Sequence, residues 1–263
     1  MRVARGRGAM LHWRQDGDPS GPAVVFANSL GTDLRLWDGV VDLLPPHLRL
    51  IRYDKRGHGL SSCPPGPYSI DDLAQDTLDL LDHAQVDSCV FVGLSIGGMI
   101  AQSLAARVPE RITGLVLSNT AAKMGEAAMW QERIAMIEAQ GIAALSDPIL
   151  ERWFAPAFLR QDAHLPWRHM LERTPKAGYI ACCQAIAGTD LSATTRGLPQ
   201  PALGIAGSLD GASPPDLVEA TLDLITDARF TLIEDTGHLP CVEAPEAYAG
   251  ALLDFLKELG HVD

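Results

Sequence analysis

The sequence predicts an α/β fold: a mostly parallel, doubly wound sheet with a helical cap inserted after the sixth strand. Three observations lead to this prediction. Short apolar runs alternate with amphipathic helical patterns through residues 1–120 and 197–263, which we assign to the core. Residues 121–196 lack a clear strand run and carry helical patterns instead, so we assign them to the cap. The chain of 263 residues is long enough for one large domain with such an insertion.

The predicted strands are short apolar runs between turn signals. Ala23–Ala27 is continuously apolar, as expected where both faces of a parallel sheet are buried. The insertion follows Ile112–Ser118, which we take as the sixth strand of this type of sheet. The other predicted strands are Met10–Gln15, Leu48–Tyr53, Cys89–Leu94, Pro201–Gly207 and Ala228–Ile233.

The predicted helices lie between these strands. Ser69–Gln85 repeats apolar residues at helical spacing, with Ser69 as N-cap before Asp71 and Asp72 in the first turn. The remaining helices of the core are Asp38–Leu44, Gly97–Arg107, Pro215–Ile225 and Pro245–Leu259, and those of the cap are Glu126–Gln140, Ile142–Phe154, Leu165–Arg173 and Gly178–Ala187.

Composition excludes several classes of partner. A formal net charge of −12 argues against nucleic acid, whose phosphates need a basic face. The sequence contains no apolar run of the roughly 18 residues that a membrane span needs, and the N-terminal region lacks the pattern of a signal peptide. Five cysteines are an odd number without framework spacing. We therefore expect a cytoplasmic protein with reduced thiols, and a homo-oligomer is compatible with the sequence.

The segment Gly93-Leu94-Ser95-Ile96-Gly97 is predicted as a sharp turn between a strand and a helix. In a G-x-S-x-G turn the serine backbone is strained, and the two glycines are needed because side chains would collide there. The turn lifts the hydroxyl of Ser95 into a cleft and places the N–H of Ile96 beside it. These two groups are the expected nucleophile and one donor of an oxyanion hole.

The loop Asn28–Thr32 follows a buried strand and is the expected source of the second oxyanion donor. In serine hydrolases of the α/β type the loop at this place in the fold supplies that donor, and we assign it to the N–H of Leu30. The alternative is that this loop of small residues only turns the chain.

A serine hydroxyl needs a base, and the base needs an orienting acid, each just past the end of a strand. Asp210 and His238 meet this requirement in the order that follows Ser95 in the chain. Asp190 lies before its strand, and Glu234 and Asp235 precede His238 too closely to orient it. His58 is the one rival base, and we expect it in a structural loop with internal hydrogen bonds. The other six histidines (12, 47, 83, 164, 169 and 261) are expected at the surface or in the cap.

The sequence lacks the common signatures of metal and nucleotide sites. It has no H-E-x-x-H motif and no paired C-x-x-C motifs, and the adjacent Cys182 and Cys183 lack ligand spacing. It also lacks the glycine-rich loops that hold phosphates. We therefore expect no metal and no cofactor.

The chain resembles the 3-oxoadipate enol-lactonases, α/β-hydrolases that open β-ketoadipate enol-lactone in the breakdown of aromatic acids. The resemblance covers nearly the whole chain. At Asn28–Thr32 many relatives have a His-Gly pair instead. The segments that carry the resemblance are Asn28–Thr32, Arg52–Gly59, Gly93–Gly98, Ser118–Ala122, Arg152–Phe154 and Gly178–Cys182.

The resemblance implies a carboxylic ester hydrolase that acts on a small lactone through an acyl-enzyme. Because that substrate carries a carboxylate, the pocket needs a cation, and we assign Arg133 in the cap to this role, with Trp130 one helical turn away and Trp153 as an apolar wall. The alternative for Arg133 is a solvated helix residue. The alternative functions are another cap-bearing hydrolase, either a carboxylesterase or a C–C bond hydrolase of ring-cleavage products, and a non-catalytic receptor on the same fold.

Overall fold

The computed structural model of the protein describes residues 1–262, and its centre is an eight-stranded sheet with the order β1-β2-β4-β3-β5-β6-β7-β8. The strands from β4 to β8 in this order are parallel to one another, whereas β2 is antiparallel to both of its neighbours, β1 and β4. The strands are β1 (Arg2–Arg5), β2 (Met10–Gly17), β3 (Ala23–Ala27), β4 (Arg49–Tyr53), β5 (Cys89–Leu94), β6 (Ile112–Ser118), β7 (Ala202–Gly207) and β8 (Ala228–Ile233).

The predicted α/β architecture is therefore confirmed, and one strand had escaped prediction. Strand β1, Arg2–Arg5, has two arginines and buries only Ala4, so it has no apolar pattern to detect. It forms because it pairs with β2 at the edge of the sheet. With β1 counted, Ile112–Ser118 is the sixth strand along the chain.

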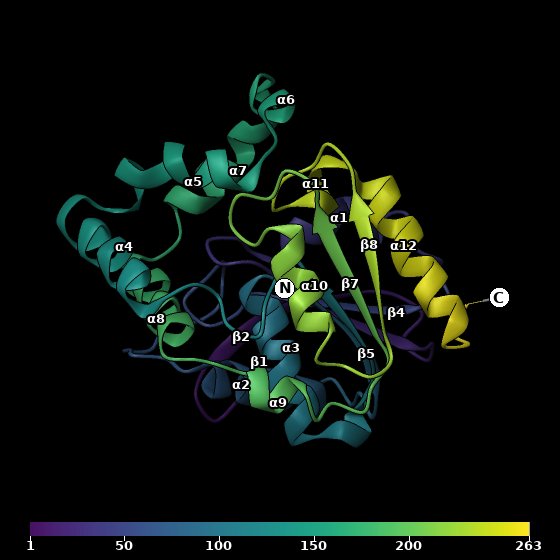
Figure 1. Cartoon of the computed structure of the whole chain (residues 1–263). Coiled ribbons are helices and arrows are strands. Elements are labelled where there is room, and N and C mark those ends of the chain that lie inside the picture. The colour runs from purple at the N-terminus through teal and green to yellow at the C-terminus, as the bar shows by residue number, and fades with distance from the viewer. Residues whose placement is uncertain (263) are drawn as a thin grey trace.

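Helices cover both faces of the sheet (Figure 1). Helices α1 and α12 pack against each other on one face, and α2, α3 and α10 cover the other. The N-cap predicted for α2 is present, because Ser69 Oγ accepts a hydrogen bond from the Asp72 N–H at 3.1 Å. These helices are α1 (Asp38–Val41), α2 (Ile70–His83), α3 (Ile96–Arg107), α10 (Pro215–Leu222) and α12 (Pro245–Glu258), with the short α11 (Pro240–Glu243), η1 (Leu34–Trp37) and η2 (Pro109–Arg111) beside them.

A run of helices joins β6 to β7. Helices α4 to α8 lie together beyond one end of the sheet (Figure 1), whereas α9 packs against α3. The predicted helix 142–154 is wrong in one respect, since it is divided into a short 3-10 turn and α5. The division of the chain into a core and a cap stays a prediction. The elements are α4 (Ala127–Gln140), η3 (Ile142–Leu145), α5 (Ser146–Trp153), α6 (Pro156–Leu159), η4 (Asp162–His164), α7 (Leu165–Glu172), α8 (Lys176–Ala187) and α9 (Ser192–Thr195).

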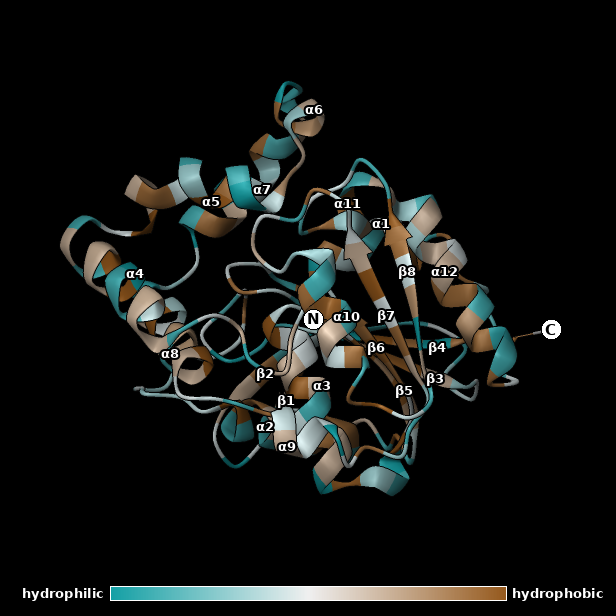
Figure 2. Ribbon diagram, in the orientation of Figure 1, coloured by the Kyte–Doolittle hydropathy of each residue, from teal (hydrophilic) through white to brown (hydrophobic). Residues whose placement is uncertain are grey.

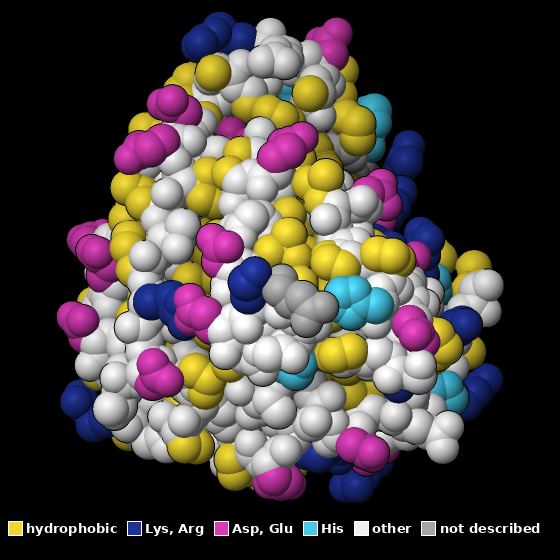
Figure 3. All heavy atoms as spheres, turned by 90° about the vertical axis from the view of Figure 1, so that its right-hand side faces the viewer, with side chains coloured by type: hydrophobic (Ala, Val, Ile, Leu, Met, Phe, Trp, Pro, Cys, Tyr) yellow, Lys and Arg dark blue, Asp and Glu magenta, His cyan; other side chains and the backbone are white. Residues whose placement is uncertain are grey.

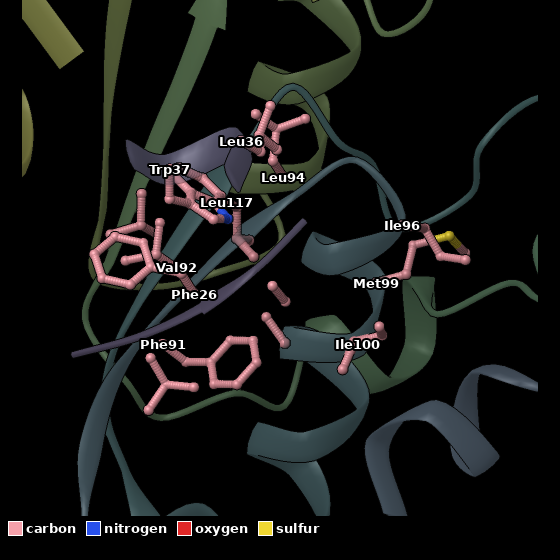
Figure 4. Close-up of a cluster of buried hydrophobic side chains, with 14 of the residues drawn as sticks. Phe26, Leu36, Trp37, Phe91, Val92, Leu94, Ile96, Met99, Ile100 and Leu117 are labelled. Carbon is pink, nitrogen blue, oxygen red and sulfur yellow. The ribbon is translucent and has the colours of Figure 1, made fainter. Parts of the chain in front are cut away.

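The hydrophobic core is centred on the middle strands. Phe26 of β3, Phe91 of β5 and Leu117 of β6 are fully buried, and they lie in the cluster of Figure 4 with side chains of α3 and η1. The central strands β3, β5 and β6 are mostly hydrophobic in Figure 2, whereas α2 and α12 alternate hydrophilic and hydrophobic residues as helices with one buried side do. This packing fixes the strand ends from which the site loops emerge.

The surface seen in Figure 3 carries acidic and basic side chains interspersed with apolar ones. Among residues 1–262, we find no helix with the length and apolar character that a membrane crossing requires.

Candidate active site

Ser95 lies in the tight turn between β5 and α3, as predicted. Its φ of 59° and ψ of −121° are a strained conformation for a residue with a side chain. A Cβ at Gly93 would collide with the backbone of Gly97, and one at Gly97 would collide with the carbonyl of Ala27. The turn is held by the Ser95 N–H, which donates to Ser118 O at 2.9 Å. Local packing thus requires both glycines and places Ser95 at the tip of the turn.

Asp210 and His238 form a buried contact between the loops that follow β7 and β8. The His238 Nδ1 lies 2.9 Å from Asp210 Oδ2. Burial acts to raise the pKa of Asp210, but the charge and hydrogen bond of His238, together with further donors, outweigh it and lower that pKa. Asp210 is therefore held as a carboxylate that can orient the imidazole of His238.

Asn119 is a residue of this site that the sequence analysis did not select. Its Nδ2 donates to Asp210 Oδ2 at 2.9 Å, and the N–H groups of Ala212 and Ser213 donate to Asp210 Oδ1 at 2.7 and 3.0 Å. Asn119 adopts a positive φ of 47° directly after β6. The available signal was its place at a strand end, the same signal that identified Asp210.

Ser95 and His238 line one cavity of about 140 Å³. Within residues 1–262 no hydrogen bond joins Ser95 Oγ to His238. The proton transfer between these two side chains therefore remains a prediction. Such contacts are often long without substrate and tighten when it binds. The structure therefore brings the predicted nucleophile and base to the same cavity, with the acid behind the base.

Leu30 and Ile96 carry the two N–H groups predicted to form the oxyanion hole, and that role stays a prediction. Leu30 lines the cavity beside Ser95, and Ile96 is the first residue of α3. In the described part of the chain neither N–H donates to another protein group. The neighbouring N–H groups are occupied, because Gly31 donates to His58 Nε2 at 3.0 Å and Thr32 donates to Ser29 O at 3.3 Å. Both donors are thus free to bind a substrate oxygen.

The three predicted substrate-binding residues line the same cavity. Trp130 and Trp153 are buried, and the guanidinium of Arg133 lies 5.1 Å from the centre of the Trp130 ring. The sequence analysis missed a second cation, Arg152, in the residue before Trp153. Burial and the charge of Arg133 lower the pKa of Arg152. Within residues 1–262 neither guanidinium forms an ion pair with a carboxylate, although the charge of Asp210 acts on Arg152. We call these two arginines of the cavity lining the positive wall.

Two histidines lie near the loop Asn28–Thr32, which we call the oxyanion loop after its predicted role, and both have structural contacts. His58 is buried and accepts the Gly31 N–H, and burial together with the Lys55 charge holds its pKa well below the usual range. His12 was expected at the surface, and that expectation is wrong: it is buried and its Nδ1 lies 2.8 Å from Asp54 Oδ2. His12 and Asp54 line a larger cavity of about 400 Å³, whose lining includes none of the three predicted catalytic residues.

The loop that carries His238 is fastened to the inserted helices. The N–H of His238 donates to Trp153 O at 2.8 Å. The carboxylate of Glu243 accepts from the Gly237 N–H at 2.7 Å and from the Ala155 N–H at 2.9 Å. Burial raises the pKa of Glu243 to about 7. These contacts couple the position of the base to the end of α5.

Comparisons with known proteins bear on the fold and the family of the chain. A family model described as alpha/beta hydrolase fold matches residues 22–139. The chain is 35% identical to 3-oxoadipate enol-lactonase 2 of Acinetobacter baylyi over 94% of this chain and 93% of that protein. It is 32% identical to 3-oxoadipate enol-lactonase 1 of the same organism over 98% and 97% of the two chains. The crystal structure of the enol-lactonase from Burkholderia xenovorans superposes with a TM-score of 0.94 at 37% identity, over 97% of this chain and 100% of that one.

Proposed function

The chain belongs to the 3-oxoadipate enol-lactonase family of α/β-hydrolases, and we propose that it opens 3-oxoadipate enol-lactone to 3-oxoadipate by an acyl-enzyme mechanism. The observation that carries this proposal is the composition of the cavity of about 140 Å³. Ser95 and His238 line it together with the unpaired guanidiniums of Arg133 and Arg152. A nucleophile and two cations in one cavity suit an ester of a carboxylate-bearing substrate.

The first half of the reaction forms the acyl-enzyme. His238 takes the proton of Ser95 Oγ as the oxygen attacks the lactone carbonyl, and Asp210 stabilises the imidazolium that results. The negative oxygen of the tetrahedral intermediate is held by the N–H groups of Leu30 and Ile96. Each such donor contributes about 2.7–4 kcal/mol, judged from side-chain donors in other enzymes.

Collapse of that intermediate breaks the bond between the carbonyl carbon and the ring oxygen. The ring oxygen leaves with the electron pair as an enolate and takes the proton from His238. An enolate is a better leaving group than an alkoxide, and ketonisation of the enol draws the ring opening forward. Water then loses a proton to His238, attacks the acyl-enzyme and releases 3-oxoadipate while Ser95 regains its proton.

The positive wall would bind the carboxylate of the lactone. A guanidinium presents parallel N–H donors that match a carboxylate. The guanidinium of Arg133 lies over the ring of Trp130. Arg152 is assigned to the same role because it lines the same cavity. We also propose that residues 121–196 act as the cap that carries this wall, with Trp153 closing its apolar side.

We also propose a cytoplasmic location for the enzyme, no requirement for a cofactor, and a small-molecule substrate. The five cysteines are free in the described residues, as expected for the cytoplasm. The mechanism uses only side chains and backbone groups of this chain, so we propose that it requires no cofactor. The substrate is a small molecule rather than nucleic acid, whose phosphates would be repelled by a formal net charge of −12.

Initial rates on three substrates test the proposed function. The wild-type enzyme is assayed with 3-oxoadipate enol-lactone, with the neutral ester p-nitrophenyl acetate and with a vinylogous diketone of the ring-cleavage type. We expect kcat/KM for the lactone to exceed that for the other two. A preference for the neutral ester would identify a carboxylesterase, and a preference for the diketone a C–C bond hydrolase.

A further inference from the structure

Lys55 is a buried lysine in the loop that follows β4, and only 2% of it is exposed. Its Nζ donates to Ser29 O at 2.5 Å and lies 3.4 Å from Thr32 O. It is not part of any ion pair formed within residues 1–262. An ammonium group is rarely buried without a carboxylate partner because its desolvation is costly. The burial of Lys55 against the oxyanion loop therefore suggests a functional role for its ammonium group.

The carbonyl that Lys55 binds belongs to the same peptide unit as the N–H of Leu30. The Ser29–Leu30 peptide bond is trans, so its C=O and N–H point in opposite directions. An ammonium group on the carbonyl side turns the N–H away from Lys55. Ser29 and Leu30 both line the cavity that holds Ser95, so this peptide lies beside the nucleophile, and its N–H has no acceptor within residues 1–262.

The loop that follows β4 carries both Lys55 and His58, and we call it the supporting loop. It also holds the next peptide of the oxyanion loop, Leu30–Gly31. His58 Nε2 accepts the Gly31 N–H at 3.0 Å, and His58 is kept neutral because burial and the Lys55 charge lower its pKa. The supporting loop is itself pressed against the start of α8, where a Cβ on Gly57 would collide with the backbone of Gly178. Lys55 and His58 thus hold consecutive peptides of the oxyanion loop from one rigid base.

We propose that Lys55 is a positioning residue of the oxyanion hole: its ammonium group holds the Ser29–Leu30 peptide so that the Leu30 N–H faces Ser95, and polarises that peptide so that the N–H binds a negative oxygen more strongly. A positive charge beside the carbonyl oxygen increases the partial positive charge on the N–H of the same unit, as in cooperative chains of hydrogen bonds. The proposal rests on the serine-hydrolase chemistry proposed above and is independent of which ester is the substrate.

The surroundings of Lys55 bring the pKa of its ammonium group close to the neutral range. Burial lowers the pKa of Lys55 to about 8, while Cys182 of α8 and the carboxylates of Asp54 and Asp33 act in the opposite direction. The neighbouring His58 stays neutral. Lys55 is therefore charged at neutral pH and loses its proton in the mildly alkaline range.

The test compares wild type, Lys55→Met and the exposed control Lys176→Met on p-nitrophenyl acetate. Active enzyme is counted by end-point titration with a fluorophosphonate. Lys55→Met should lower kcat about ten- to a hundredfold with KM within about twofold, since the oxyanion forms only in the transition state. Its affinity for phenylboronic acid, whose adduct with Ser95 places an oxygen in the hole, should fall in parallel. Lys176→Met should match the wild type in both.

A purely structural Lys55 gives a different result. In that case kcat per titrated site and the phenylboronic acid affinity stay at wild-type values while Tm falls, and the proposal is overturned. If the wild type hydrolyses neither ester nor lactone, the proposed function fails instead, which distinguishes the two failures.

A second measurement applies if Lys55→Met does not fold. The kcat of the wild type should decline above about pH 8 as the ammonium group loses its proton. Lys55→Arg, which keeps its charge there, should extend the plateau to higher pH. A wild-type kcat that stays constant through this range would overturn the proposal.

Discussion

We propose that Arg133 and Arg152 make the site selective for anionic substrates. Both lie in the cavity of Ser95, and neither has a carboxylate partner in the described residues. Burial, and after it the charge of Arg133, lower the pKa of Arg152, as expected where two like charges lie near each other. A substrate carboxylate between or beside them would relieve this repulsion.

Replacing Arg133 by Met should therefore act on charged substrates alone. We expect KM for the anionic enol-lactone to rise about ten- to a hundredfold, because a hydrogen bond to a charged group contributes about 1.5–3 kcal/mol. KM for p-nitrophenyl acetate should change by less than about twofold. Steady-state kinetics measure both, with the exposed arginine variant Arg160→Met as control. An equal effect on the two substrates would remove Arg133 from the anion site.

At the scale of single residues, the sequence identifies groups whose chemistry and position coincide. Asp210 and His238 stand at strand ends and can ionise, so they could be predicted. Asn119 has the same position but no proton chemistry of its own, and its hydrogen bond to Asp210 requires the fold to be known. Arg152 could not be selected because the lack of a carboxylate neighbour depends on packing rather than on sequence.

At the scale of elements, α8 and the loop that follows β4 meet at two glycines. A Cβ on either Gly57 or Gly178 would collide with the backbone of the other. Gly178 lies within α8, where its conformation alone would accept alanine. The need for glycine there comes from the close approach of the two segments.

Alanine at two helical glycines should therefore have opposite effects on stability. Gly178→Ala should lower the free energy of unfolding by about 1–3 kcal/mol through overpacking. Gly250→Ala, in α12 with no described atom within 4 Å of the added Cβ, should raise it by about 1 kcal/mol through helix propensity. Urea denaturation measures both. Stabilisation by Gly178→Ala would show that the two segments are not in tight contact.

Glu243 links the loop of His238 to the end of α5, and its protonation couples stability to pH. Burial raises its pKa in the folded protein to about 7, above its ordinary value of 4.5. The folded state thus favours the protonated form. The stability contributed by this group is complete below the ordinary pKa and is lost as the pH rises to about 7.

The Tm difference between wild type and Glu243→Gln should accordingly depend on pH. We expect the wild type to lose stability relative to this non-titrating variant between about pH 4.5 and pH 8. Thermal melts across this range measure the difference, with the exposed Glu234→Gln as control. A difference that stays constant or grows in favour of the wild type would contradict the assignment.

At the scale of the whole molecule, alternation of apolar runs and helical patterns is enough to predict the sheet and its covering helices. The prediction works because strands that are buried on both faces consist of consecutive apolar residues. Strand β1 escaped because an edge strand needs no such run, and α6 escaped because it has only four residues, Pro156–Leu159. The position of the inserted helices over the strand ends depends on contacts such as the one between Trp153 and His238, which the sequence does not display.

The most direct test of the whole account is hydrolysis of 3-oxoadipate enol-lactone by the wild type and by Ser95→Ala, followed by chromatography of released 3-oxoadipate. We expect rapid turnover by the wild type and a loss of at least about a thousandfold in kcat in the variant, since removing the nucleophile of a triad abolishes nearly all of its rate. A wild-type rate no faster than buffer, or a variant that keeps its rate, would contradict it.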